Sequence, residues 1–225
     1  MQTHGRQSPT ADDTRDRLIE AAARLFAERG IGGVSLREIN REAGAKNAVA
    51  VQYHFGDRAG VVRAISAKHA PTVDARRHAM LDEYEAKGEA ALRALVAALV
   101  RPLASKLDDR EGGLDYLQIH AELTNIPPTR DTSGDDPDRK DSMQRWRVHV
   151  EPFITDDAAR LHRRFAAIRF SALEIGRRAR TGPHRDDRLF VSDLIDLVTG
   201  MLAAPPSDET TRLMKERDTA RAKRR

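Results

Sequence analysis

Cysteine is absent from the 225 residues of the chain. Its absence excludes a disulfide framework, a thiolate metal site and a thiol nucleophile, and it is compatible with a reducing compartment. The sequence also lacks an apolar run that approaches the roughly 20 residues of a membrane helix. Residues 1–13 are polar, unlike the apolar core of a signal sequence. We therefore expect a cytoplasmic protein without a membrane segment.

Patterns that carry enzyme chemistry are lacking as well. The sequence contains no glycine-rich phosphate loop and no serine, histidine and aspartate arrangement typical of a hydrolase. No set of histidines or carboxylates has a metal-ligand spacing that rises above chance. We therefore predict that the protein is not an enzyme and has no catalytic residues, metal site or cofactor.

The charge balance is only a weak indication of partners. The formal net charge of +4 and the isoelectric point near 9.6 favour polyanionic partners. However, charged residues of both signs make up 33% of the chain, as they do on the surfaces of many ordinary helices.

Apolar residues recur at helical spacing along most of the chain, without strand-like alternation or an internal repeat. The predicted fold class is therefore all-α. The first apolar stripe consists of Leu18, Ala22, Leu25 and Phe26. It predicts a helix from about residue 12 to Gly30, because glycine is favourable directly after a helix end.

Two short helices should follow the first one. Ser35 and Glu38 have the spacing of a capping box, in which a hydroxyl and a carboxylate each bind a backbone N–H that the helix leaves unpaired. Gly44 should end this helix, because glycine tolerates a positive φ. Asn47 is a suitable N-cap for the next helix, predicted over residues 47–55.

Longer helices with several breaks should make up the rest of the chain. Their apolar stripes lie in the ranges 58–84, 92–103, 114–124, 155–180 and 186–203. Pro71 should kink or break the first of them. Residues 125–138 are rich in proline and aspartate and predict a mobile loop. Residues 212–225 are strongly basic and predict disorder or a frayed helix, with phosphate contacts as the alternative.

Four segments of the N-terminal third share a distinctive order and spacing. They are residues 17–30 (RLIEAAARLFAERG), 34–39 (VSLREI), 43–44 (AG) and 53–58 (YHFGDR). In this arrangement they resemble the DNA-binding domain of the TetR family of transcriptional regulators. The resemblance covers about residues 12–68. Beyond them it is only architectural.

The resemblance implies four parts. A flexible N-terminal arm would cover residues 1–11, and a helix-turn-helix DNA-binding domain would cover residues 12–68. A larger helical domain for effector binding and dimerisation would occupy residues 69–207. A basic, flexible tail would complete the chain at residues 208–225.

Three positions depart from the family pattern. Lys46 is one residue more than the commonest turn between the second and third helices contains. Gln52 stands where the family usually has tyrosine, and the tyrosine is shifted to Tyr53. Asn40 occupies a position where a small apolar residue is usual. The sequence alone offers no physical reason for Asn40.

In a helix-turn-helix, the second helix meets base edges while neighbouring groups hold the phosphates. If Val51 and Phe55 face inward, the outer face can read bases: Gln52 would pair with adenine, and Val49 would pack on a thymine methyl group. The predicted DNA-contacting residues are Arg37, Lys46, Asn47, Ala48, Val49, Gln52, Tyr53, His54 and Arg58. In the alternative, His54 satisfies a local hydrogen bond, and Arg37 and Lys46 are solvated surface charges.

A single recognition helix reads only a few base pairs, so we expect a two-fold homodimer on a palindromic double-stranded operator. The family resemblance implies that the last two long helices, 155–180 and 186–203, form the interface. Its apolar contacts would come from Phe165, Ile168, Leu173, Leu189, Leu194, Leu197, Val198 and Met201. For about half of them, the alternative is the core of the same chain.

The resemblance also implies a small-molecule effector cavity among the middle helices. Its candidate lining residues are Tyr84, Leu99, Leu103, Tyr116, His120, Trp146, His149 and Phe153, for which ordinary core packing is the alternative. The sequence thus predicts a dimeric, sequence-specific transcriptional regulator, by family habit most often a repressor, released by an effector. The competing hypothesis is an architectural protein that binds DNA with little sequence preference.

Overall fold

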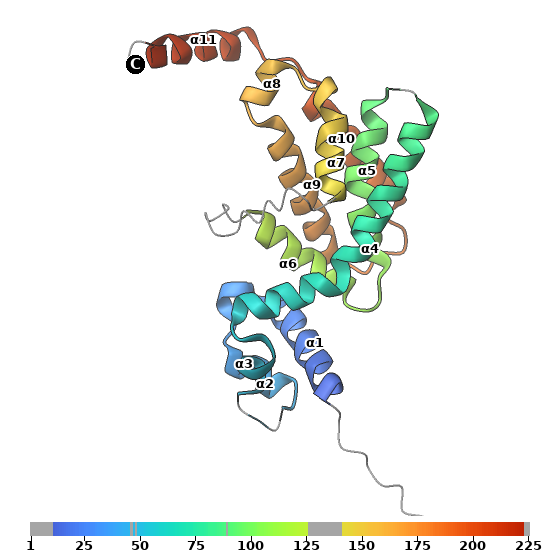
Figure 1. Cartoon of the computed structure of the whole chain (residues 1–225), viewed down its shortest axis with the longest axis vertical. Coiled ribbons are helices and arrows are strands. Elements are labelled where there is room, and N and C mark those ends of the chain that lie inside the picture. Colours follow the sequence, from blue (N-terminus) through green and yellow to red (C-terminus); the bar gives the residue numbers. More distant parts are fainter. Residues whose placement is uncertain (1–10, 46, 48, 89, 126–140, 223–225) are drawn as a thin grey trace, which may run out of the picture.

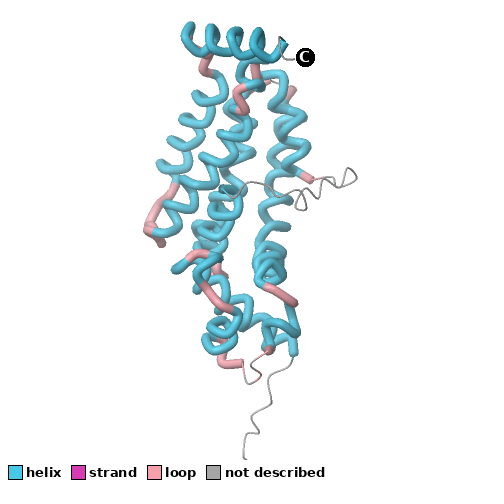
Figure 2. The backbone as a smooth tube through the Cα atoms, turned by 90° about the vertical axis from the view of Figure 1, so that its left-hand side faces the viewer, coloured by secondary structure: helices cyan, strands magenta, loops and turns pink. Residues whose placement is uncertain are grey.

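The structure is a computed structural model that describes residues 11–45, 47, 49–88, 90–125 and 141–222. Within these ranges the chain consists of helices and connecting loops, without a strand, which confirms the all-α prediction (Figure 2). The helices are α1 (Ala11–Arg29), η1 (Ile31–Gly33), α2 (Leu36–Glu42), α3 (Ala50–Phe55), α4 (Arg58–Lys87), α5 (Leu92–Ala104), η2 (Ser105–Asp108), α6 (Gly113–Asn125), α7 (Ser142–Val150), η3 (Glu151–Phe153), α8 (Asp156–Arg160), α9 (Arg163–Arg180), α10 (Arg188–Ala203) and α11 (Asp208–Ala222).

The three N-terminal helices form one end of the elongated molecule, and α11 lies at the other end (Figure 1). Helix α1 ends before Gly30, whose φ of +77° is the left-handed conformation that glycine adopts without strain. Leu18 and Phe26 of α1 pack with Ile39 of α2 and Val51 of α3 in a continuous buried core. This core fixes the two short helices against the longer one.

Helix α4 connects this end of the molecule with the larger helical part. It runs through Pro71 without a break, and its direction changes along its length, in agreement with the predicted kink (Figure 1). Its first half packs against α1 and α3, and its second half packs against α5 and α7. Gly88, with a φ of +64°, ends the helix.

The larger part is built around α5, in which all residues from Leu95 to Val100 are buried. The indole N–H of the fully buried Trp146 in α7 donates a hydrogen bond of 2.7 Å to the carbonyl of Leu95. Helices α6 and α9 pack closely because Gly176 has no side chain. A Cβ atom at this position would lie 2.5 Å from the Cβ of Ala121. Any larger residue would force the two helices apart.

Several predicted boundaries require correction. Helix α3 begins at Ala50, three residues later than predicted. The helix predicted over residues 155–180 is divided into α8 and α9 at His162, which has a left-handed φ of 57°. Helix α7 was not predicted from the sequence. Residues 126–138 of the predicted loop lie outside the described residues.

Residues 208–222 form helix α11, and a helix was one of the forms expected for residues 212–225; the flexibility of residues 208–225 stays a prediction. The helix extends sideways from the top of the helical bundle in Figure 1 and crosses that end of the molecule in Figure 2. In the described part of the chain, no single helix has both the length and the hydropathy of a membrane span. Among the described residues, one pair of helices, α10 and α11 with a bend of 50° between them, meets those two criteria together.

Candidate functional site

The start of α2 is fixed by the predicted capping box. The Ser35 hydroxyl accepts a hydrogen bond of 3.3 Å from the backbone N–H of Glu38, whose Oε2 accepts one of 2.8 Å from the N–H of Ser35. Arg29 donates to the other carboxylate oxygen at 2.6 Å. The backbone N–H of Ser35, followed by the Arg29 guanidinium, lowers the pKa of Glu38 to about 2. The carboxylate is therefore charged at neutral pH, and the cap is complete.

Replacing Ser35 with alanine is expected to lower the free energy of unfolding by about 1 kcal/mol at pH 7, because one N–H at the start of α2 loses its acceptor. Denaturant unfolding measures this change. Ser207→Ala is the matched control, because the Ser207 hydroxyl accepts a hydrogen bond from Thr210 N at the start of α11. Helix α11 has no extensive packing against another described element, so the loss of its cap should change the free energy of unfolding less. If both variants lose the same free energy of unfolding, the capping box of α2 contributes no more to the stability of the fold than the exposed cap of α11.

The structure gives Asn40 a physical role. Its carboxamide is buried, with 5% of the residue exposed, and Oδ1 accepts a hydrogen bond of 3.0 Å from the backbone N–H of Val51 in the first turn of α3. Val49, the residue before α3, provides no side-chain cap of its own. A side chain of α2 thus satisfies a backbone donor at the start of α3. A small apolar residue at position 40 could not do so.

The segment that leads into α3 is an irregular turn. Asn47 is exposed, and its Oδ1 accepts a hydrogen bond of 3.0 Å from Val49 N. Its carbonyl accepts from Ala50 N at 3.1 Å. Asn47 therefore stabilises the turn and is not the N-cap of α3, contrary to the prediction. Lys46 and Ala48, two predicted DNA contacts, lie outside the described residues.

Helix α3 has one buried face and one exposed face. Val51 is buried, whereas Val49 and Gln52 are exposed and 83% of Tyr53 is accessible. His54 is partly buried, and the centroid of its ring lies 5.1 Å from the ring centroid of Tyr53. The imidazole forms no hydrogen bond with the described residues. The exposed side chains form a compact surface on an anchored helix. The polar amide and the small apolar group on it match the chemistry of base edges, and the phenol can donate a hydrogen bond to a phosphate.

Phe55, which was expected to face inward, is half-buried. It packs against the core, and the Arg15 guanidinium lies 5.5 Å from the ring centroid. The junction with α4 is tight, because a Cβ at Gly60 would lie 1.8 Å from the Phe55 carbonyl oxygen. Asp57 caps α4 by accepting from Gly60 N at 2.6 Å. These contacts hold the end of α3 firmly on α4.

The two predicted phosphate-binding arginines have different environments. Arg37 of α2 is exposed and has no hydrogen bond or ion pair with the residues that the structure describes. Its guanidinium is therefore available to a phosphate. Arg58, although exposed, donates a hydrogen bond of 2.8 Å to the carbonyl of Val34. Arg58 thus also ties the start of α4 to the segment before α2.

Two short helices at a fixed angle, with an exposed outer face on the second, define a helix-turn-helix of the DNA-binding class. Residues 18–65 match the family model for bacterial regulatory proteins of the tetR family. The match confirms the resemblance seen in the sequence. It identifies these residues as the DNA-binding domain of a TetR-family transcription regulator. A search of curated proteins gives no match to the chain.

A cavity of about 940 Å³ lies among α4, α5, α6, α7 and α9. Its lining includes four residues of the predicted effector site, namely Leu99, Leu103, Tyr116 and His120. The other four lie elsewhere. Trp146 is part of the core, Tyr84 contacts His149 edge to face with 5.6 Å between ring centroids, and Phe153 is half-buried in η3.

Arg77 is a cavity residue that the sequence analysis missed. It belongs to α4 and is buried together with Val73 and Leu81, one turn away on either side. This spacing of four residues is the signal that could have revealed it, since a charged residue in an apolar stripe is unusual.

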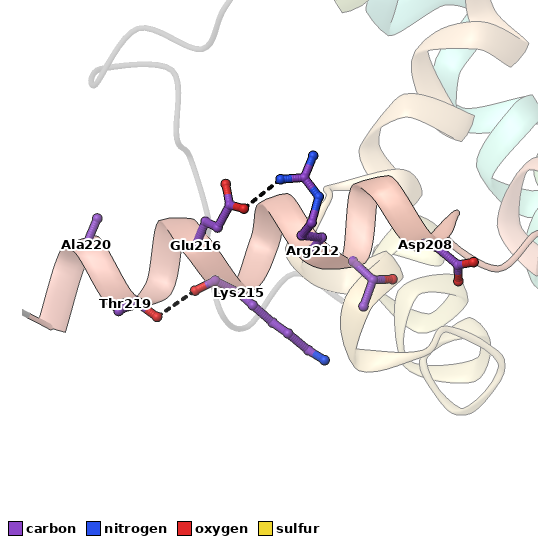
Figure 3. A pocket seen from close by; sticks show the side chains of 7 residues that line it. Asp208, Arg212, Lys215, Glu216, Thr219 and Ala220 are labelled. Carbon is purple, nitrogen blue, oxygen red and sulfur yellow. Dashed lines mark hydrogen bonds and ion pairs between the residues drawn. The ribbon is translucent and has the colours of Figure 1, made fainter.

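A second hollow, of about 670 Å³, runs along α11 (Figure 3). All its lining residues come from this helix, and Arg212 and Glu216 form an ion pair of 2.6 Å on its surface. A single helix cannot enclose a small molecule. The cavity among the five helices is therefore the better candidate for an effector site.

Proposed function

We propose that the protein is a dimeric, sequence-specific regulator that represses transcription until a small molecule releases it from DNA. The observation that carries the DNA-binding part of this proposal is the exposed face of α3 with Val49, Gln52 and Tyr53, held in place by the contacts of Asn40 and Gly60. A regulator of bacterial type that binds DNA would act in the cytoplasm, where the DNA is.

Within this surface, Gln52 and Val49 would read bases, while the phosphates would be held by Arg37, Lys46, Tyr53, His54 and Arg58. The exposure of Gln52 and the free guanidinium of Arg37 support this division. Binding to phosphates contributes affinity for any sequence, whereas a bidentate contact to a base edge contributes discrimination. The two groups can therefore be separated by experiment.

Gln52→Ala is expected to reduce discrimination at one base position of each half-site by about 1–3 kcal/mol. Arg37→Ala is the matched control and should weaken operator and random DNA alike, with a smaller dependence of affinity on salt. Fluorescence anisotropy with operators that carry single base changes measures both effects. If both variants lose affinity equally on operator and random DNA, the division into base-reading and phosphate-holding residues is wrong.

A homodimer through α9 and α10 is supported by the apolar side chains that these helices leave exposed. Four of the eight predicted interface residues, Phe165, Leu173, Leu189 and Leu197, are exposed. Leu194 and Val198 are buried within the chain, as the alternative of an intramolecular core expects, and Ile168 and Met201 are partly buried. Two protomers related by a two-fold axis would present two α3 helices to a palindromic operator.

Release by an effector is supported by a direct connection between the cavity and the DNA-binding domain. Both carboxylate oxygens of Glu122 accept from the backbone N–H of Ile31 in η1, each at 3.1 Å. Glu122 belongs to α6, as do the cavity residues His120 and Leu123. A ligand that shifts α6 would therefore displace the segment between α1 and α2. Differential affinity for the two arrangements is all that such a switch requires.

Selection of bound sequences from random DNA tests the proposal as a whole. A palindromic consensus is expected, because the proposed dimer has two-fold symmetry. The alternative, an architectural DNA-binding protein, is favoured by the basic residues of α11. It predicts weak discrimination with steep salt dependence for all sequences. The absence of any symmetric consensus would therefore favour the architectural role.

A further inference from the structure

The cavity among α4, α5, α6, α7 and α9 has an apolar wall and a distinct polar group of residues. Leu99, Leu103, Leu123 and Ile168 contribute to the wall. Arg77, Tyr116 and His120 lie together in its polar lining, which also includes Arg63, Ser66, Asp74, Asp141 and Ser171. A volume of about 940 Å³ lies within the range of small-molecule sites in proteins, roughly 300–1,000 Å³. The cavity therefore fits an amphipathic small molecule.

Arg77 is a buried cation without a paired carboxylate. Only 7% of the residue is exposed, and Nη1 donates a hydrogen bond of 2.9 Å to the Ser142 hydroxyl. Nε has no partner, and no carboxylate of the described residues lies within ion-pair distance of the guanidinium. A buried charge of this kind is costly unless an anion compensates it.

Two acidic side chains, Asp74 and Asp141, also line the cavity, and both have other partners. Asp74 accepts a hydrogen bond of 3.1 Å from Ser142 N and lies 3.6 Å from Nε2 of His78. Asp141 accepts from Met143 N at 3.0 Å and caps α7. Both carboxylates attract Arg77 through space, but neither forms an ion pair with it. The donors of the guanidinium are thus only partly satisfied by the protein.

Tyr116 and His120 lie one turn apart on α6, with their ring centroids 5.7 Å apart. Within the described residues, neither the Tyr116 hydroxyl nor a ring nitrogen of His120 has a hydrogen-bond partner. Burial and, secondly, the charge of Arg77 lower the pKa of His120 to about 4, so that the imidazole is neutral at pH 7. Burial raises the pKa of Tyr116, which keeps its hydroxyl protonated and able to donate.

We propose that the cavity binds a small organic carboxylate with an apolar body. The carboxylate would accept hydrogen bonds from Arg77 and the Tyr116 hydroxyl, and the apolar body would lie against the leucine and isoleucine wall. A cationic ligand would be repelled by Arg77, and a neutral one would leave its guanidinium without a paired carboxylate. This inference rests on the proposed effector site and specifies the chemical class of the molecule that occupies it.

A matched series of probes tests the chemical class. Decanoate, 4-phenylbutyrate and 1-naphthylacetate are each compared with the corresponding primary amide and amine, and binding to the full chain is measured by isothermal titration calorimetry without DNA. At least one carboxylate is expected to bind at least about tenfold more tightly than its amide and its amine, since a charge-assisted hydrogen bond is lost in both.

Variants of the polar group test the assignment to Arg77. Arg77→Met should lose the preference for the carboxylate by about tenfold or more, whereas Arg76→Met, at the exposed neighbouring position, should keep it. Tyr116→Phe should weaken carboxylate binding about threefold to tenfold and retain the ring that stacks on His69. If Arg77→Met does not fold, as judged by its thermal transition, Tyr116→Phe carries the test alone.

Four outcomes would overturn the inference: no member of the series binds, amides or amines bind most tightly, Arg77→Met keeps the full preference, or Tyr116→Phe binds the carboxylate as tightly as the unmodified protein. These outcomes are independent of DNA binding, which the selection from random DNA tests separately. A carboxylate that binds as expected but leaves the affinity for the selected operator unchanged would contradict release by an effector. It would leave the ligand class of the cavity intact.

Discussion

Asn40→Leu is expected to weaken operator binding by about 30-fold or more. Leucine fills the space of asparagine but cannot accept the hydrogen bond from Val51 N, which is buried at the start of α3. A buried N–H that loses its acceptor costs about 1–3 kcal/mol. The first turn of α3 would avoid this cost by loosening, and DNA would then have to order it again. A dimer contains two such helices, so the expected loss in the free energy of operator binding is about 2–6 kcal/mol.

Asn40 is a positioning residue, because it acts on DNA only through α3. The decisive measurement is therefore the ratio of affinities for operator and random DNA, together with the melting temperature. A disordered α3 should lower the ratio, whereas a purely structural loss should lower the melting temperature and leave the ratio unchanged. Asn40→Asp retains an acceptor and should recover most of the ratio.

Asn47→Ala is the matched control for the melting temperature alone, because Asn47 is itself a predicted DNA contact. Asn47 also accepts a backbone N–H near the start of α3, but it is exposed, so water can replace its carboxamide. Its loss should therefore lower the melting temperature much less than the loss of Asn40. Should Asn40→Leu bind the operator with unchanged affinity and specificity, the bond to Val51 would have no part in presenting α3.

The features that the sequence predicted correctly depend on local contacts. The end of α1 at Gly30 and the capping box of Ser35 and Glu38 join residues only a few positions apart, and residue type and spacing are sufficient to find them. The bond from Val51 to Asn40 joins residues 11 positions apart on different helices. A buried asparagine has no local pattern that reveals its partner, so its role required the structure.

The errors in helix boundaries also have physical causes. At Asn47, the carboxamide binds Val49 N and stabilises a turn in competition with the helix, which delays the start of α3. At His162, the chain takes a left-handed conformation without the glycine that usually marks one. The uninterrupted helical spacing of residues 155–180 therefore concealed the break between α8 and α9.

The cavity was only partly predictable for a related reason. Leu99, Leu103, Tyr116 and His120 share faces of α5 and α6, and their helical spacing was visible in the sequence. The same spacing is typical of core residues, and Trp146 proved to be one of them. Only the packing of α4 against these helices distinguishes residues around a void from residues in a filled core.

Leu189→Asp combined with Leu197→Asp is expected to produce a monomer and to weaken operator binding by about a hundredfold or more. The two leucines are 83% and 52% exposed on α10, so the single chain gains nothing from their apolar side chains. In the proposed dimer they would be buried, and two carboxylates would oppose those of the partner across the two-fold axis. In a dimer, binding of one α3 helix at its half-site raises the effective concentration of the second α3 helix at the other half-site, and a monomer loses this advantage.

Sedimentation velocity measures the oligomeric state, and anisotropy with full operators and half-sites measures binding. The variant should retain the half-site affinity of the unmodified protein, because α3 is distant from α10 along the molecule (Figure 1). Leu213→Asp, at another exposed leucine on α11, is the matched control and should remain dimeric. A double variant that stays dimeric would place the interface on a different surface. A monomeric variant with full operator affinity would instead refute the requirement for two coupled recognition helices.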